Sequence, residues 1–410
     1  MPGAYWVETL GCPKNQVDSD KLEGLLVGEG YERAASAADA DLVVVNTCAF
    51  IEAARQESID TVLALAEQRR EGARVVVTGC MAERYGDELA DALPEVDAVA
   101  GFGVPVTLTS KPGAPAFDLL NLPRPKAAVP WAYVKVAEGC DRNCGFCAIP
   151  QFRGRQRSRT VDAILAEIDQ LGATVKEVVL VAQDLARYGM DEGDRRIVPL
   201  VEAVAGRVER VRLLYLYPSD LTDALVDTVC ATDVPYFDLS LQHVSPPLLR
   251  RMRRWGDGER FLRRIDDIRR RRPDAVFRSN FIVGYPGETE DDHDALLRFV
   301  DAAQLDWCGF FAYSREDGTF AATLDGAVDT RLVNDRLNEL TDLQDRITAE
   351  HRARLVGTSI DVLVDEPGIG RSWREAPEID GIVSVPASLP VGTIETVTVH
   401  AAAGPDLEAT

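Results

Sequence analysis

The first hundred residues alternate short β-branched hydrophobic runs with amphipathic stretches. The runs are YWVETL (5–10), DLVVVNT (41–47) and RVVVTG (74–79), and helix-like stretches follow at about 16–28, 52–70 and 81–92. Strands that alternate with helices predict a parallel sheet with crossover helices. A cysteine follows each run: Cys12, Cys48 and Cys80. Because the carboxyl ends of parallel strands meet at one edge of a sheet, we expect these three thiols to lie close together.

A second series of strands begins after the proline-rich stretch KPGAPAFDLLNLPRPKAAVP at 111–130. Its members, mostly separated by amphipathic stretches, are AYVKVAEG, KEVVLVAQD, VRLLYLYP, YFDLSLQ, VFRSNFIVG and CGFFAYS. This alternation predicts a (β/α) barrel of six strands, where a complete barrel has about eight. From about residue 350, TSIDVLVDE, GIVSVP and TIETVTVHA are separated by Gly and Pro without helices. That pattern predicts a small β-barrel of the OB kind.

The predicted fold class is therefore α/β, in three domains. We place a parallel-sheet domain at 3–118, a six-stranded partial (β/α) barrel of the TIM type at 126–348 and the small β-barrel at 350–408. A length of 410 residues, 46% hydrophobic and 27% charged, suits a folded protein of several domains. No apolar run reaches the roughly 18 residues of a membrane helix. Since MPGAYWVETLGC also lacks the basic and apolar regions of a signal peptide, a cytoplasmic location is expected.

Three of the eight cysteines fall within the stretch EGCDRNCGFC (138–147), directly after the first predicted barrel strand. Thiolates of Cys140, Cys144 and Cys147 can hold three irons of a cubane cluster, and no fourth cysteine follows nearby. The fourth iron then stays open to a ligand with an amine and a carboxylate. S-adenosylmethionine has both groups, and an electron passed into its sulfonium would release a 5′-deoxyadenosyl radical. The alternatives are a zinc site completed from elsewhere in the chain and a chance clustering of cysteines.

These motifs resemble those of the radical SAM enzymes and, within them, the methylthiotransferases. The C-x3-C-x2-C loop carries the first resemblance, and TLGCPKNQVDSD, VVVNTCAF and VVVTGCMA carry the second. The resemblance implies two uses of S-adenosyl-L-methionine, one donating methyl to sulfur and one generating the radical. It also implies two [4Fe–4S] clusters, one on Cys12, Cys48 and Cys80 and a SAM-coordinating one on Cys140, Cys144 and Cys147. From the residues alone, the amino-terminal cysteines could equally be buried small apolar residues.

Other stretches are similar to one branch of the methylthiotransferases, which modifies the β-carbon of an aspartate in ribosomal protein twelve of the small subunit. These stretches are GCPKNQVDSDKLEG, FDLSLQHVSPPLLRRMRR, FRSNFIVGYPGETEDD and IGRSWREAPEIDG. The resemblance implies that ribosomal protein as a partner, a reducing electron donor, and a tail that is a TRAM domain. One alternative is the branch that modifies an adenosine in transfer RNA. A weaker one is an iron–sulfur electron-transfer or sulfur-carrier protein, which would need no barrel.

Charge favours a protein substrate over RNA. The net charge is −22, and residues 350–410 contain ten acidic residues and four arginines, a balance of −6. Such a surface repels phosphates and attracts a basic ribosomal protein, so neither direct RNA binding nor a membrane partner is expected. An acidic surface kept for solubility is the alternative for the tail. Eleven arginines between Arg250 and Arg272 depart from this balance, and a solvated helix face is one interpretation of them.

Residues at the predicted mouth of the barrel are candidates for contact with S-adenosylmethionine or the substrate. They are Phe146, Gln183, Asp184, Gln242, Ser279, Gly284 and Glu288. Arg153 and Arg155 could contact the substrate carboxylate or the cofactor, or be solvated. We expect His243, Cys230 and Cys308 to be structural. No catalytic residue is assigned beyond the cluster ligands, because hydrogen abstraction by a radical needs no general base.

Overall fold

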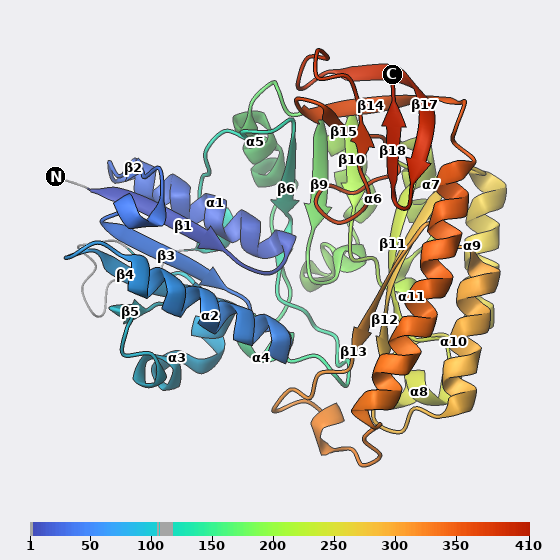
Figure 1. Cartoon of the computed structure of the whole chain (residues 1–410), viewed down its shortest axis with the longest axis horizontal. Helices are drawn as coiled ribbons and strands as arrows, with labels where there is room; N and C mark the ends of the chain where they lie inside the picture. The colour runs from blue at the N-terminus through green and yellow to red at the C-terminus, as the bar shows by residue number, and fades with distance from the viewer. Residues whose placement is uncertain (1–2, 105, 107–117) are drawn as a thin grey trace.

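The computed structural model describes residues 3–104, 106 and 118–410, which form three parts (Figure 1). An amino-terminal sheet lies beside a larger half-barrel, and the carboxyl-terminal strands cover one end of that half-barrel. The three-part α/β architecture is as predicted. Over the described residues, no helix combines the length and the apolar character needed to cross a membrane.

The amino-terminal part is a parallel sheet with strand order β2-β1-β3-β4-β5. The three predicted strands are confirmed as β1 (Ala4–Thr9), β3 (Leu42–Thr47) and β4 (Arg74–Gly79), and the short edge strands are β2 (Glu32–Arg33) and β5 (Ala98–Val99). Helices α1 (Pro13–Gly28), α2 (Glu52–Gln68) and α3 (Cys80–Ala92) connect them. Every residue of β3 is buried, as expected for a central parallel strand that is covered on both faces.

The central part contains the six predicted barrel strands. They are β6 (Trp131–Lys135), β9 (Glu177–Val181), β10 (Arg210–Leu213), β11 (Tyr236–Gln242), β12 (Val276–Val283) and β13 (Trp307–Ala312). The sheets β6-β9-β10 and β11-β12-β13 are joined by a single parallel bridge between Leu216 and Leu239. The strands therefore follow one another in chain order, and the barrel stays open between β6 and β13.

Helices pack on the outside of these strands. They are α5 (Val161–Leu171), α6 (Ile197–Ala205), α7 (Asp223–Ala231), α8 (Pro246–Arg251), α9 (Gly258–Arg271), α10 (Glu290–Ala303) and α11 (Thr330–Ala353). The short helix α4 (Ile149–Phe152) instead packs against the amino-terminal part, where Phe152 shares a buried cluster with Met81 of α3. A short hairpin pairs β7 (Ala137–Glu138) with β8 (Arg157–Ser158), and 3₁₀ helices occupy Ala37–Asp39, Leu119–Asn121, Leu185–Arg187, Met190–Glu192, Pro218–Asp220 and Ala321–Thr323. The predicted domain boundary at 348–350 falls inside α11. The division at 118, 126, 348 and 350 stays a prediction, and residues 107–117 lie outside the described part.

The arginine-rich stretch forms most of α9, an amphipathic helix. Phe261, Ile265 and Ile268 recur at helical spacing and are buried against the strands. On the outer face, Arg264 and Arg271 form ion pairs with Asp223 of α7. The arginine-rich face of α9 is therefore exposed to solvent, as predicted, and also forms ion pairs with α7.

The tail forms a closed barrel with strand order β14-β15-β16-β18-β17, which confirms the predicted small β-barrel. Its strands are β14 (Ser359–Glu366), β15 (Ile369–Arg371), β16 (Val383–Ser384), β17 (Ile394–Ala403) and β18 (Asp406–Ala409). Its core is largely valine and leucine, such as Val362, Val399 and Leu407.

The segment 372–380 between β15 and β16, here called the tail plug, enters the amino-terminal end of the half-barrel. Ala376 is fully buried in one hydrophobic cluster with Tyr133, Tyr236 and Trp307 of the barrel strands. Barrel side chains donate hydrogen bonds to plug carbonyls: Tyr133 Oη to Pro377 over 2.9 Å, and Trp307 Nε1 to Arg374 over 2.9 Å. The plug closes the end of the barrel that lies opposite the predicted catalytic mouth.

Buried ion pairs fix the tail to the barrel. Arg371 contacts Glu177 of β9 at 3.0 Å, and Asp380 contacts Arg278 of β12 at 3.3 Å. Although burial alone would raise it, the guanidinium groups of Arg212 and Arg371 hold the pKa of Glu177 at about 2. Several tail charges, of both signs, are thus satisfied internally, so the ten acids and four arginines of the tail do not all lie on its surface.

Candidate active site: two cysteine triads

The amino-terminal cysteines lie at the carboxyl ends of adjacent parallel strands. Cys12 precedes α1, Cys48 follows β3 and Cys80 begins α3. A Cβ atom on Gly11, whose φ is +95°, would lie 2.9 Å from Cys48 Sγ, so the turn after β1 passes directly against that thiol. Burial and, to a smaller extent, negative charge on Cys12 and Cys80 raise the pKa of Cys48 to about 12. The structure thus brings three sequence-distant thiols to one edge of the sheet.

Arg153 reaches this triad from the other part of the molecule. Its Nη2 and Nε donate to Cys80 Sγ over 3.0 and 3.3 Å, and Nη2 also donates to Asn15 Oδ1 over 2.7 Å. The Arg153 side chain is 2% exposed, whereas the Arg155 side chain is 95% exposed. The solvated interpretation is therefore wrong for Arg153, whereas Arg155 is exposed; contact of either side chain with the substrate or the cofactor stays a prediction. The guanidinium ion places a fixed positive charge beside Cys80.

A buried charge network links the two triads. Arg153 Nη1 donates to both carboxylate oxygens of Glu138 over 3.0 Å and to Asp18 of α1 over 3.2 Å. Lys135 at the end of β6 pairs with the same two acids. Although burial favours its neutral form, the neighbouring Arg153 and Lys135 hold the pKa of Glu138 far below its usual range. Glu138 stands two residues before Cys140, so the network connects Cys80 to the start of the second cysteine loop.

The second triad lies on the loop after β7, at the carboxyl-terminal end of the barrel strands. Backbone hydrogen bonds fix this loop on several sides: Cys140 N donates to Gly154 O over 3.1 Å, and Gly145 N donates to Met252 O over 2.8 Å. Gly139 has a φ of +78°, and a Cβ atom there would lie 2.1 Å from Arg155 O. Burial and, to a smaller extent, the neighbouring cysteines raise the pKa of Cys147 to about 12. The loop therefore holds three thiols in a backbone frame that requires glycine at its first turn.

Two arginines stack on Tyr217 beside this loop. Arg142 lies 3.7 Å and Arg254 lies 4.0 Å from the ring centroid of Tyr217. Arg254 Nη1 donates to Cys144 Sγ over 3.3 Å, which repeats the contact of Arg153 with Cys80. Arg142 Nε donates to Asp184 Oδ2 over 2.6 Å, and its Nη2 donates to Asp220. The loop is thus flanked by cations whose positions are fixed by acids and by an aromatic ring.

Four of the residues predicted to lie at the mouth of the barrel are near the triads or at strand ends. Gln183 and Asp184 lie at the triads: Gln183 Nε2 donates to Glu138 over 2.7 Å, while Gln183 Oε1 and Asp184 Oδ1 are buried without a hydrogen-bond partner among the described residues. Gln242, at the end of β11, has a φ of +70°, and partly buried Phe146 packs against the barrel core.

Three further candidates make internal contacts. Ser279 Oγ donates to Leu239 O over 2.8 Å, Gly284 N donates to Glu288 Oε2, and Glu288 pairs with Arg336 at 2.9 Å. These contacts give each of the three a structural role, and their predicted contact with the cofactor remains untested.

The residues expected to be structural have matching surroundings. His243 is buried and its Nδ1 accepts from Ser245 N over 3.1 Å, and burial lowers the pKa of His243 to about 4, so the ring is neutral near pH 7. Cys230 and Cys308 are partly buried and pack against the barrel core.

Sequence reasoning missed the residues that surround the thiols: Asn15, Asp18, Glu138, Arg142 and Arg254. One signal was present, because Asp18 lies on the helix predicted at about 16–28 and Asn15, directly before it, is three residues away, at the spacing of one helix face. The partners of Glu138, Arg142 and Arg254 come from distant segments, and no spacing in the sequence indicates them.

The donor sets are compatible with cubane clusters. Over residues 3–104, 106 and 118–410, no three His, Cys, Asp or Glu side chains are close enough to hold one metal ion. A cubane has several separate irons and so takes thiolates that are further apart. Each triad also receives N–H donation to a sulfur, from Arg153 at Cys80 and from Arg254 at Cys144. Such hydrogen bonds to sulfur are one means by which proteins set the reduction potential of an iron–sulfur cluster.

Family models match each part of the chain. The model of the radical SAM superfamily matches residues 134–300, that of uncharacterized protein family UPF0004 matches residues 4–101, and that of the TRAM domain matches residues 356–410. Among solved structures, a radical S-adenosylmethionine methyltransferase, TsrM from Kitasatospora setae, has a similar fold, with a TM-score of 0.58 and 15% identity over 90% of this chain and 77% of that one. The half-barrel, its cysteine loop and the family match define a radical SAM enzyme, a class that uses S-adenosylmethionine and [4Fe–4S] chemistry.

Full-length relatives give a narrower assignment. The protein named ribosomal protein uS12 methylthiotransferase RimO from Kineococcus radiotolerans is 42% identical over 97% of this chain and 95% of its own length. The protein of the same name from Moorella thermoacetica is 42% identical over 95% of each chain. The chain belongs to the RimO family of radical SAM methylthiotransferases.

Proposed function

We propose that this chain adds a methylthio group to the β-carbon of an aspartate in ribosomal protein uS12. Two [4Fe–4S] clusters would serve the reaction, one on Cys12, Cys48 and Cys80 and one on Cys140, Cys144 and Cys147. The names of the full-length relatives support the substrate. The observation that carries the proposal is the connection of the two triads through Arg153 and Glu138, because a transfer that uses both sites needs them held in a fixed relation.

When bound, the clusters and S-adenosylmethionine would supply the sulfur, the methyl group and the 5′-deoxyadenosyl radical. The residues of the chain position these groups. Arg153 and Arg254 place positive charge and N–H donors at one sulfur of each triad. Gln183 and Asp184 present polar atoms that have no partner in the described residues, and these atoms are available to a bound ligand. Tyr217, between Arg142 and Arg254, helps to exclude water from one side of the loop.

The acidic surface of the tail would attract the basic ribosomal protein. Three of its acids are engaged internally: Asp365 with Arg371, Glu375 with Arg352 and Asp380 with Arg278. The docking surface therefore consists of exposed acids such as Glu366 and Glu408. A reducing electron donor and a cytoplasmic location belong to the same proposal, and direct binding to RNA does not.

The test is an anaerobic reaction of cluster-reconstituted protein with S-adenosylmethionine, reductant and sulfide. Ribosomal protein uS12 and an adenosine-modifiable transfer RNA would be offered in parallel, and mass spectrometry would look for one added methylthio group on each. Addition on the aspartate peptide alone is expected. Addition on the RNA alone would overturn the substrate assignment and favour the other methylthiotransferase branch. Addition on neither, with both clusters intact, would favour an electron-transfer or sulfur-carrier role.

A further inference from the structure

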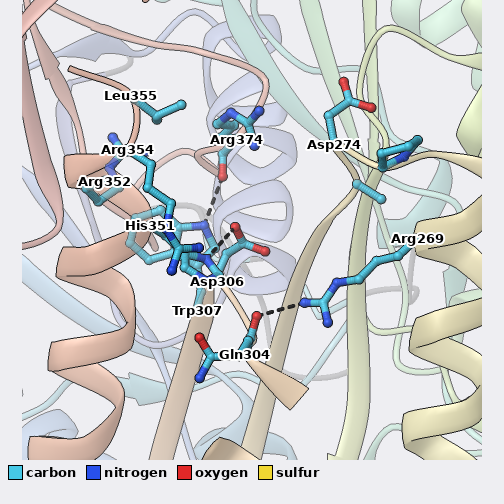
Figure 2. A pocket seen from close by; sticks show the side chains of 12 residues that line it. Arg269, Asp274, Gln304, Asp306, Trp307, His351, Arg352, Arg354, Leu355 and Arg374 are labelled. Atoms are coloured by element: carbon cyan, nitrogen blue, oxygen red, sulfur yellow. Dashed lines mark hydrogen bonds and ion pairs between the residues drawn. The ribbon is translucent and has the colours of Figure 1, made fainter. Parts of the chain in front are cut away.

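A pocket of about 690 Å³ lies where the tail meets the half-barrel (Figure 2). It is built from the end of α9, the residues before β12 and β13, the end of α11 and Arg374 of the tail plug. Asp274 precedes β12 and Trp307 begins β13, so the pocket is at the amino-terminal ends of the strands. The cysteine loop is at the other ends, about 20 Å away for a strand of the length of β13. The pocket is thus separate from the candidate active site.

Cations outnumber anions around this pocket. Arg269, Arg352, Arg354 and Arg374 line it together with two acids, Asp274 and Asp306. Figure 2 shows these arginines approaching from different elements: Arg269 from one side, Arg352 and Arg354 from the opposite side, and Arg374 from above. The chain as a whole has a net charge of −22, so a pocket lined by four arginines is a local region of opposite charge.

The two acids are already occupied by other groups. Asp306 accepts a hydrogen bond from Phe277 N over 2.9 Å and pairs with His351 at 3.3 Å. Asp274 pairs with Arg272 at 2.8 Å. None of these partners is one of the four lining arginines, so the acids do not hold the pocket cations in direct ion pairs.

Two of the four arginines have groups that lack acceptors, whereas Arg269 donates to Ala303 O and Gln304 O over 2.8 and 2.7 Å and Arg354 lies 3.8 Å from Glu350. The guanidinium group of Arg374 has no hydrogen bond or ion pair within the described part of the chain, and it lies over the Trp373 ring at 4.1 Å. Arg352 is 3% exposed; its Nη1 binds Glu375, while Nε and Nη2 are buried without an acceptor among the described residues. Burial lowers the pKa of Arg374, as expected for a cation that lacks a paired anion.

We propose that this pocket binds a small oxyanion, a ligand that carries phosphate or carboxylate groups. Guanidinium groups match both ligands because their planar N–H pairs fit two oxygen atoms at once. The volume is that of a small-molecule site. A nucleic-acid backbone would instead need an extended basic groove to neutralise successive phosphates, and the overall charge of the chain opposes that. The ligand would contact Arg374 of the tail plug and Arg354 at the end of α11, and so would hold the two parts together. Arg269, whose Nη atoms already donate to Ala303 O and Gln304 O, would add positive charge.

The test is isothermal titration of the cluster-loaded full chain at low ionic strength, with inorganic phosphate and citrate as separate probes and sodium chloride as the background control. An RNA hairpin is titrated in parallel. The Arg374→Gln variant removes the unpaired guanidinium, and Arg354→Gln removes an exposed one at the rim. The matched control is Arg346→Gln, an exposed arginine on α11 that does not line the pocket. Thermal unfolding of each variant checks that it is folded.

Saturable binding of one molecule of phosphate or citrate is expected, and the better probe distinguishes the two oxyanion classes. Arg374→Gln should weaken it at least tenfold, Arg354→Gln severalfold, and Arg346→Gln less than twofold. The bound oxyanion should also raise the unfolding temperature of the wild-type chain and not that of Arg374→Gln. No saturable binding, or equal binding by all variants, would overturn the proposal. Binding of the hairpin alone through Arg374 would overturn it too and identify an RNA contact.

Discussion

Arg153 donates two hydrogen bonds to Cys80 Sγ, over 3.0 and 3.3 Å, although the two residues are 73 positions apart. Arg153 belongs to the segment that follows the barrel cysteine loop, and Cys80 belongs to the amino-terminal sheet. The same guanidinium group binds Glu138, two residues before Cys140. One buried side chain therefore touches the surroundings of both triads.

Replacing Arg153 by Gln should damage the amino-terminal site and the contact between the two parts. Asp18 and Glu138 would lose a buried cationic partner, and breaking such a pair costs about 3–5 kcal/mol. Loss of the positive charge and of N–H donation to sulfur should also lower the reduction potential of the cluster at Cys80. Chemical unfolding and an EPR-monitored redox titration would measure the two effects.

Arg155→Gln is the matched control for that variant, since Arg155 lies two residues away with a side chain 95% exposed. It should change neither the unfolding free energy nor the reduction potential. Equal behaviour of the two variants would contradict a specific role for Arg153.

Removing one thiol from each triad should separate the two halves of the reaction. Cys144→Ala should abolish cleavage of S-adenosylmethionine to 5′-deoxyadenosine and lower the iron content by about half, because only one of two cubanes is lost. Cys48→Ala should lose a similar amount of iron, retain that cleavage and produce no methylthio transfer. Iron analysis and chromatography of the nucleoside product would measure both. Cys308→Ala, on β13, should keep all the iron; loss of iron in this control would contradict the assignment of ligands.

The Glu177→Gln variant should destabilise the junction of the tail with the barrel in a pH-dependent way. Arg212 and Arg371 hold the pKa of buried Glu177 at about 2, below its ordinary value of 4.5. A lowered folded-state pKa stabilises the protein at pH values above 4.5, and this contribution is lost as the pH falls toward 2. At pH 7 the ionisation is worth about 3 kcal/mol. The difference in unfolding temperature between the wild type and the variant should therefore narrow from pH 7 to pH 3.5; a constant difference would contradict the assigned pKa.

The turn before Cys140 should tolerate no side chain. In Gly139→Ala, the new Cβ would lie 2.1 Å from Arg155 O, so the loop must shift and the cluster on Cys140 should be lost. Gly154→Ala is the control: its φ of +74° is similar, but open space surrounds its Cβ position. That variant should lose only about 1 kcal/mol of unfolding free energy, because its backbone has a positive φ, and should keep the cluster. Absorption near the iron–sulfur band would distinguish the two variants.

The strand-end cysteines were predictable from the sequence because strand periodicity and parallel topology are local signals. The same holds for the six barrel strands and the closed tail barrel. The partner of Arg153 was not predictable, since its contact with Cys80 depends on how two separate sheets meet. Ser279 and Glu288 were predicted from their positions on or after β12, but position along a strand does not say whether a side chain is already bonded internally.

The surface charge of the tail is a second property that the sequence alone does not reveal. A count of acidic residues treats every carboxylate as surface, whereas Glu375 and Asp380 are paired with arginines from α11 and β12. Burial and pairing are properties of the fold and cannot be read from composition.

The tail plug means that the carboxyl-terminal module is not an interchangeable appendage. Residues 372–380 form the floor of the half-barrel, so a chain cut after α11 would open that end and leave the fully buried Arg212 and Glu177 without their tail partners. A functional hybrid that carries a foreign tail must therefore keep this nine-residue segment and exchange only the outward faces of β14 and β17. Natural recombination between relatives with different tails is subject to the same constraint.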